Sequence, residues 1–405
     1  MLIEFTVGNF LSFKEKKTLS LEASSIKDNP ENIIEIGRYK LLRSVVLYGA
    51  NSSGKSNFIK GITRMSEMVR HSAKESSTSE IDVVPFLMNS ETDNKPSYFE
   101  ILFLIEETRY RYGFEANKKI IYSEWLFECK ANKETLLFIR DKDSIEIGLE
   151  FDEGKGIEEK TRDNALFLSV CDQFNGAVSK KIIAWFNKQH IFSGLHHEIK
   201  KNLTSTFLRD KGLKLWIKDF LIPLSLGFND LGLIEFEKGV NQVVTYHNKY
   251  DKEGNVIDEL ALDLVKQESS GTNKLYDMAG TLVYGLKLGT LTVIDELDAK
   301  LHPLLTMAIV KLFHSSGNNA QLIFATHDTN LLNYGCFRRD QIYFTEKNRL
   351  EETDIYSLVE YRTPDGRKIR NDNSFEKDYI AGRYGAIPYV GDFSKLMNDG
   401  PSSED

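Results

Sequence analysis

The sequence predicts an α/β protein built around a parallel β-sheet. Two short apolar runs with strand character, residues 44–48 and 291–294, are each followed by residues with helical spacing. A third apolar run, residues 321–326, comes after a helix expected over residues 303–313. Runs of this length are typical of strands buried on both faces, and the order strand, helix, strand is typical of a parallel sheet.

Antiparallel strands are expected in the first third of the chain. Apolar and polar residues alternate over residues 3–7 and again over 18–22, which predicts a hairpin. Aromatic-rich patterns over residues 98–114 and 120–127 predict further strands. From about residue 165 to residue 235 the spacing becomes helical, with Ile191 among the apolar positions. The sequence therefore predicts a mainly helical segment in the middle of the chain.

The bulk composition is ordinary for a soluble globular protein, with 41% hydrophobic and 28% charged residues. The net charge of −8 argues against a surface devoted wholly to nucleic acid, but it leaves a local basic patch open. Cys129, Cys171 and Cys336 are odd in number and far apart, so we expect free thiols in a reducing compartment. No signal peptide is expected, and the longest apolar stretch, residues 220–228, is too short to span a bilayer. These features predict a cytoplasmic protein.

The most informative segment for function is a turn rich in small residues that joins the strand at 44–48 to a helix. Backbone N–H groups in such a turn, together with the helix N-terminus, are suited to bind phosphate. Lys55 would neutralise the β- and γ-phosphates, and the Ser56 hydroxyl would ligate Mg²⁺. The alternative is an ordinary surface turn. We expect an ATP-binding P-loop formed by Gly49, Ala50, Asn51, Ser52, Ser53, Gly54, Lys55, Ser56 and Asn57.

Two adjacent carboxylates follow the strand at 291–294, in the form of a Walker B strand. Asp295 would hold Mg²⁺ through water, and Glu296 would polarise the attacking water as general base. A strand that ends in Asp-Glu is common, and solvent-exposed acids are the alternative. Its position after a P-loop and within a strand–helix–strand unit favours the catalytic interpretation.

A histidine follows the next parallel strand. Because open parallel sheets bind ligands at the carboxyl ends of their strands, His327 is placed to hydrogen-bond the γ-phosphate and stabilise the transition state. The alternative is a structural or solvent-exposed histidine.

A Ser- and Gly-containing helix start is the fourth element. Ser269, Ser270, Gly271 and Thr272 precede a helix stripe over residues 275–286, and a helix start of this kind can bind an anion. Taken alone, the segment is explained more simply as a serine N-cap.

The order of these elements resembles that of ABC-type ATPases. In that resemblance, residues 269–272 correspond to the signature sequence, Asp298 to the D-loop and His327 to the H-switch. More closely, the chain resembles the AAA15 family, which includes sensor ATPases of two-gene anti-phage systems such as PARIS and AbiL. The segments that carry this resemblance are residues 9–13, 49–57, 268–272, 295–303, 326–327, 339–342 and 379–388.

The resemblance implies that two chains meet head to tail around ATP. ATP on one chain's P-loop would be capped by the signature helix of a second copy, so dimerisation would depend on ATP. It also implies a separate effector protein, a toxin or nuclease encoded nearby, and a role in antiviral defence. The cofactors implied are ATP and Mg²⁺, and no membrane partner is implied.

Some positions depart from the transporter pattern. The signature reads Glu-Ser-Ser-Gly-Thr, where transporter subunits usually have Leu-Ser-Gly-Gly-Gln. No segment matches a Q-loop clearly, and residues 85–89 are taken as its expected position. Phe13 or Lys14 is a possible adenine contact, whereas Phe10 and Phe13 fit the core equally well.

The expected fold class is α/β, an ABC-type P-loop ATPase head with a mixed β-sheet, N-terminal antiparallel strands and a mainly helical mid-chain insertion. Four regions are expected. They are the N-terminal part of the ATPase domain (1–150), the helical insertion (151–265), the C-terminal part of the ATPase domain (266–345) and a C-terminal extension with a disordered tail (346–405).

Several functions compete at this point. The leading hypothesis is an ATP-switched sensor that controls an effector, and the alternative is a DNA-repair ATPase clamp. An importer subunit fits the signature less well. Nuclease activity of this chain is not expected, because only about 78 residues follow His327, which is below the usual size of a domain with its linker. A basic run formed by Arg362, Arg367, Lys368 and Arg370 is interpreted as a loop in preference to a nucleic-acid contact.

Overall fold

The computed structural model describes residues 1–130, 133–142, 144–196, 200–236, 240–315, 317–333, 335–363, 366–367, 369 and 374–388. Lys368, Arg370 and the tail expected over residues 400–405 lie outside the described residues.

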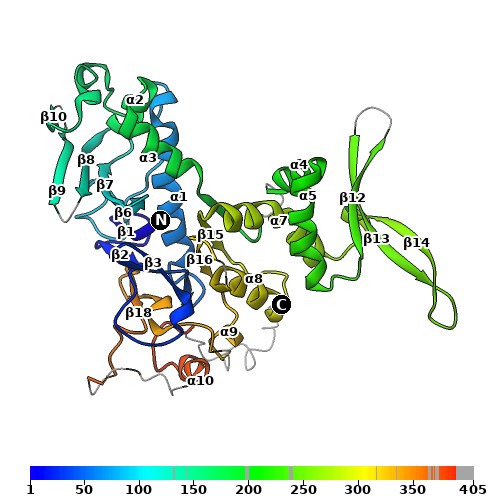
Figure 1. Cartoon of the computed structure of the whole chain (residues 1–405). Coiled ribbons are helices and arrows are strands. Elements are labelled where there is room, and N and C mark those ends of the chain that lie inside the picture. The colour runs from blue at the N-terminus through cyan, green and yellow to red at the C-terminus, as the bar shows by residue number, and fades with distance from the viewer. Residues whose placement is uncertain are drawn as a thin grey trace, which may run out of the picture.

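A six-stranded sheet forms the centre of the molecule, in the order β11-β15-β16-β5-β17-β18 (Figure 1). Neighbouring strands run parallel from β11 to β17, and β18 is antiparallel to β17. This confirms the predicted parallel sheet and the mixed character of the fold. The strands are β5 (Ser44–Gly49), β11 (His190–Ser193), β15 (Leu291–Asp295), β16 (Gln321–Ala325), β17 (Ile342–Lys347) and β18 (Thr353–Ser357).

The two faces of this sheet belong to two hydrophobic cores. Along β5, Val45 and Leu47 pack into one core, and Val46 and Tyr48 pack into the other. Side chains alternate in this way because successive residues of a strand point to opposite faces. Helix α1 (Lys55–His71) packs in the first core, while α7 (Ser270–Leu288) and α8 (Pro303–Ser315) pack in the second.

A seven-stranded antiparallel sheet completes the first core, in the order β10-β9-β8-β7-β6-β1-β2. The predicted N-terminal hairpin is present, with Phe5 opposite Leu19. Helices α2 (Phe167–Gln173) and α3 (Ala177–Asn187) pack in the same core. The strands are β1 (Leu2–Gly8), β2 (Lys17–Ser20), β6 (Ser97–Ile105), β7 (Thr108–Ala116), β8 (Ile121–Lys130), β9 (Lys133–Asp141) and β10 (Ser144–Ile147).

The middle of the chain contains the expected helices and also strands that the sequence did not reveal. Helices α4 (Lys201–Arg209) and α5 (Lys211–Leu221) pack beside α7 and precede a three-stranded antiparallel sheet, which Figure 1 shows projecting from the body of the molecule. Ile191 was expected on a helix, but it lies in β11, a four-residue strand with only two apolar residues, which is too short for spacing to distinguish a strand from a helix. The sheet consists of β12 (Asp230–Phe236), β13 (Val240–Tyr250) and β14 (Val256–Asp263), followed by α6 (Leu264–Gln267).

The C-terminal part adds β18 to the central sheet, so this sheet extends beyond the boundary expected at residue 345. The remaining elements are β3 (Ile33–Ile36), β4 (Tyr39–Leu42), α9 (Asn330–Asn333) and α10 (Phe375–Ile380). No helix in the described ranges is long and apolar enough to cross a membrane.

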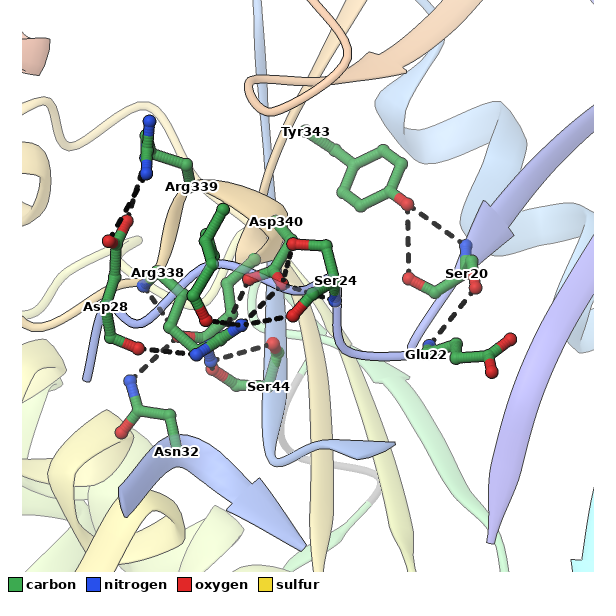
Figure 2. Close-up of polar contacts among 12 residues, drawn as sticks. Ser20, Glu22, Ser24, Asp28, Asn32, Ser44, Arg338, Arg339, Asp340 and Tyr343 are labelled. Atoms are coloured by element: carbon green, nitrogen blue, oxygen red, sulfur yellow. Dashed lines mark hydrogen bonds and ion pairs between the residues drawn. The ribbon is translucent and has the colours of Figure 1, made fainter. Parts of the chain in front are cut away.

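A buried ionic cluster joins the N-terminal segment to the start of β17 (Figure 2). The Arg338 side chain is fully buried and donates to both carboxylate oxygens of Asp340, at 2.9 and 2.8 Å. Asp340 also accepts from the backbone and the hydroxyl of Ser24, both at 2.8 Å. Arg339 pairs with Asp28 at 2.8 Å. Residues 339–342, which carried part of the family resemblance, therefore have a structural role.

Replacing Asp340 with alanine should destabilise the protein strongly. The change leaves the buried Arg338 guanidinium without its carboxylate, and breaking a buried pair in this way costs about 3 kcal/mol or more. Urea unfolding followed by circular dichroism measures the loss. The matched control is Asp354→Ala, which removes the exposed partner of Lys17 and should cost less than about 1 kcal/mol. Equal stability of the two variants would contradict the structural role of the cluster.

Candidate functional site

The P-loop connects β5 to α1, as the sequence predicted, and two of its residues have left-handed backbone conformations. Ser52 has φ 63°, and Gly54, the N-cap of α1, has φ 116°. A Cβ atom on Gly54 would lie 2.5 Å from the side chain of Thr353. Glycine is therefore required at position 54 both by its conformation and by the close approach of β18.

Hydrogen bonds from distant segments fix the end of the P-loop. The Thr353 hydroxyl donates to the carbonyl oxygen of Ser53 (3.0 Å) and is 2.8 Å from the Ser12 hydroxyl. The Asn57 amide donates to the same Ser12 hydroxyl at 2.8 Å. On β17, the Thr345 hydroxyl is 2.6 Å from that of Ser53. The N-terminal segment and the last two strands of the sheet thus hold the loop in place.

Lys55 is buried and bonded to its own loop. Its ammonium donates to the carbonyl oxygens of Gly49 (2.8 Å) and Ala50 (3.0 Å). Burial lowers the pKa of Lys55 to about 8, and the carboxylates of the 295–298 loop oppose this effect. At neutral pH the side chain is therefore a cation beside the loop that would hold phosphates.

One open cavity of roughly 600 Å³ brings together three of the predicted elements. Residues 51–57 line it together with Glu296 and His327, and so does Lys347. The P-loop, the acidic strand end and the strand-end histidine therefore share one site. They meet because β5, β15 and β16 are parallel, so their carboxyl ends lie at the same edge of the sheet.

The acidic loop after β15 offers oxygen atoms to a cation. Within the described residues, Oδ1 of Asp295 and Oδ1 of Asp298 are buried without a hydrogen-bond partner. Carboxylate and hydroxyl oxygens are the ligands that Mg²⁺ prefers, so Asp295 and the Ser56 hydroxyl fit the expected metal. Glu296 has φ 54°, a left-handed conformation that is costly for a residue with a side chain.

His327 follows β16 at the edge of the cavity. Burial lowers the pKa of the imidazole, and the positive charge of Lys55 lowers it further. The ring is therefore neutral at pH 7. The backbone N–H of His327 donates weakly to Oδ2 of Asp298, at 3.4 Å.

The Ser269–Thr272 segment does not line the P-loop cavity. The Ser269 hydroxyl accepts from the backbone N–H of Thr272 at 3.1 Å, so the simpler N-cap interpretation describes its local role. Ser269 and Ser270 are exposed at the start of α7. Glu268, where transporters usually have Leu, points to the projecting sheet and lies 2.7 Å from Nε2 of His247.

The expected Q-loop and adenine contacts are not found at this cavity. Residues 85–89 do not line it, and Asn9 accepts a hydrogen bond from their backbone at 3.0 Å. Phe13 is wrong as an adenine contact, because its ring is fully buried in the hydrophobic core. Lys14 forms an ion pair with Glu352 at 2.8 Å.

Sequence reasoning missed Thr345, Lys347 and Thr353. These residues lie on β17 and β18, after the last motif, and a threonine or lysine on a strand carries no signal of its own. Ser12 lies in a segment noted only for its family resemblance.

A family model described as "AAA domain, putative AbiEii toxin, Type IV TA system" matches residues 44–333. The chain belongs to this family. Membership of this AAA family agrees with the P-loop geometry and makes the protein a nucleotide-binding ATPase domain. No curated protein matches the chain.

Among solved structures, heads of SMC proteins are similar to this AAA-family chain. They include an SMC head bound to the C-terminal winged-helix domain of ScpA (TM-score 0.49), the SMC head domain from Thermotoga maritima (0.43) and a Pyrococcus furiosus Smc head with an extended coiled coil (0.42). Each is 13% identical and matches over 88% of this chain, and the match covers 97%, 98% and 96% of the three solved chains, respectively.

Nucleotide affinity should fall as the pH rises above about 8. The pKa of Lys55 is about 8 in the free protein, and a bound phosphate would raise it, so binding above this pH must take up a proton. The affinity loss should approach about tenfold per pH unit. Titration with a fluorescent, non-hydrolysable ATP analogue between pH 7 and pH 10 measures it. Lys55→Met should bind weakly at every pH, and a flat profile for the parent protein would contradict the prediction.

Proposed function

We propose that this chain is an ATP-hydrolysing molecular switch that dimerises around ATP and controls a separate effector protein. The observation that carries the proposal is the single cavity in which the P-loop, Glu296 and His327 meet. Each of these residue types has a role in phosphoryl transfer to water, and their geometry supports those roles.

The chain's own residues would divide the chemistry as follows. Residues 49–57 bind the phosphates, with the Lys55 cation beside the β- and γ-phosphates. Glu296 accepts a proton from water as the water oxygen bonds to the γ-phosphorus and the bond from that phosphorus to the bridging oxygen breaks. Neutral His327 donates a hydrogen bond to the γ-phosphate. Ser56 and Asp295 would hold Mg²⁺, which neutralises charge on the phosphate oxygens when bound.

The position of the signature segment supports a two-chain site. Ser269 and Ser270 are exposed and lie outside the cavity of their own chain, so this helix start is available to a second copy. A helix N-terminus attracts negative charge, and the γ-phosphate of ATP on the partner is a suitable anion. We infer a head-to-tail dimer with ATP between the P-loop of one copy and residues 269–272 of the other. Asp298 would then lie near the junction.

The effector is inferred from the family. The family description names a toxin and a toxin–antitoxin system, and such systems consist of paired proteins. Because the description applies the word toxin to the AAA domain itself, it supports a paired partner protein without assigning the partner's activity. The toxin or nuclease nature of that partner, its nearby gene and the role in anti-phage defence rest on the resemblance to AAA15 sensor ATPases. The alternative, a DNA-repair clamp, would require nucleic acid to act on the ATPase.

Glu296→Gln should retain ATP binding and lose turnover. Glutamine cannot accept the proton from water, so we expect hydrolysis to fall by roughly 10²- to 10⁴-fold. An ATP-bound dimer should accumulate, which light scattering coupled to size-exclusion chromatography detects. Glu35→Gln, which changes an exposed acid paired with Lys40, is the matched control and should behave as the parent. Turnover near the parent value would remove Glu296 as the base.

Adding DNA distinguishes the two candidate functions. For the switch, duplex DNA should leave ATP turnover unchanged, and the protein encoded by the adjacent reading frame should co-purify with the Glu296→Gln chain. For the clamp, turnover should rise with DNA and the effect should weaken steeply with salt. Stimulation by DNA without a co-purifying neighbour would reject the effector proposal.

A further inference from the structure

A buried lysine outside the motifs joins the signature helix to the acidic loop. Lys274 lies one turn into α7, and its side chain is fully buried. Its ammonium donates to three backbone carbonyl oxygens, those of Ala299 (2.6 Å), Leu297 (2.8 Å) and Glu296 (3.4 Å). In the part of the chain that the structure describes, no carboxylate pairs with it. All three ammonium hydrogens are thus directed at one short loop.

This loop has a backbone that needs external support. Glu296 and Lys300, one at each end, both have left-handed conformations, with φ of 54° and 61°. Such conformations cost of order 1–3 kcal/mol each and persist only where the surroundings enforce them. The N–H of Leu297 donates to the carbonyl of Ala325 on β16 at 3.1 Å, and Lys274 binds the carbonyls. The loop is therefore fixed on one side by the sheet and on the other by α7.

Two glycines permit this close packing. Gly194, just after β11, donates its N–H to the carbonyl of Asp295 at 2.6 Å, and a Cβ there would lie 2.8 Å from the Lys274 nitrogen. A Cβ on Gly271 would lie 2.9 Å from the carbonyl oxygen of Lys300. The first turn of α7 therefore touches the end of the loop at Lys300, while Lys274 binds carbonyls from Glu296 to Ala299.

These contacts join two functional segments, the start of α7 and the loop of residues 296–300. The start of α7 would contact ATP on the partner chain, whereas the loop presents Glu296 to the chain's own site. A shift of the helix start would reach the loop through the Lys274 ammonium and through the contact between Gly271 and the Lys300 carbonyl.

We propose that Lys274 is a positioning residue that couples the signature helix to Glu296 of the same chain. Capping of the partner's ATP by α7 then sets the position of the carboxylate that acts on the chain's own ATP. The two ATP sites of a dimer are thereby linked. This inference rests on the proposed function, because it requires ATP hydrolysis in a two-chain site.

The first test compares Lys274→Met with Lys287→Met. Methionine keeps the aliphatic stem and removes the three donors. Lys287 lies on the same helix, exposed beside Trp216, and is the matched control. For Lys274→Met we expect affinity for a fluorescent ATP analogue within about twofold of the parent and kcat about 100-fold lower, as for a small displacement of a catalytic group. Lys287→Met should match the parent in both. A folded Lys274→Met with parental kcat would overturn the proposal.

Mixed dimers test whether the effect stays within the chain. A Lys55→Met chain, which should bind ATP only weakly, is supplied in large excess at an ATP concentration that fills the second chain alone. Paired with the Lys55→Met chain, a Lys274→Met chain should hydrolyse ATP more slowly than a parental chain does in the same pairing. In the reverse pairing, Lys55→Met and Lys274→Met are on the same chain and the partner is parental. The parental chain should then hydrolyse ATP as fast as it does when paired with the Lys55→Met single variant. Loss confined to the reverse pairing would mean that Lys274 acts by presenting α7 to the partner, which contradicts the proposal.

Two controls keep the outcomes distinct. Absence of ATP turnover or of ATP-dependent dimers in the parent would refute the proposed function, whereas normal parental behaviour with a fully active Lys274→Met would refute only the role of Lys274. If Lys274→Met does not purify folded, Lys274→Gln replaces it. Glutamine keeps two N–H donors, and the same separation of affinity from kcat is expected.

Discussion

The hydroxyl of Thr353 is the contact on which the geometry of the site most depends. It bonds the P-loop at Ser53 and the N-terminal segment at Ser12, and its methyl group closes the space above Gly54. The loop between β5 and α1 is thereby held by the far edge of the central sheet. The phosphate-binding geometry is therefore a property of the assembled domain and is not determined by the glycine-rich segment alone.

The sequence identified residues that share the cavity better than it identified the residues that support them. Gly49–Ser56, the Asp295–Glu296 pair and His327 were found because phosphate binding and water activation restrict the residue types allowed. Their convergence followed from three buried apolar runs that had to form parallel strands. Thr353 was missed because its role depends on strand pairing between distant segments, which a single sequence does not display. Lys274 was missed because its partners are backbone carbonyls, which every residue carries.

In the fold, too, the elements with regularly spaced apolar residues were predicted, and those without such spacing were not. The N-terminal hairpin and the βαβ unit repeat apolar residues at regular spacing, and both were predicted correctly. The projecting sheet β12–β14 was not predicted, because β14 is exposed over most of its length and shows no clear apolar alternation. It is nevertheless tied to the signature segment through His247 and Glu268. That contact gives Glu268 a structural role just before the start of α7.

The separation between the P-loop and its supports has a consequence for biosynthesis. Ser53 and Thr353 are 300 residues apart in the chain. At the usual 5–20 residues per second, a ribosome needs roughly 15 to 60 s to pass from one to the other. For most of that interval the nascent chain carries the P-loop without β17, β18 or the buried Arg338 cluster. The loop is among the first parts of the domain to be made, and it acquires its final shape among the last.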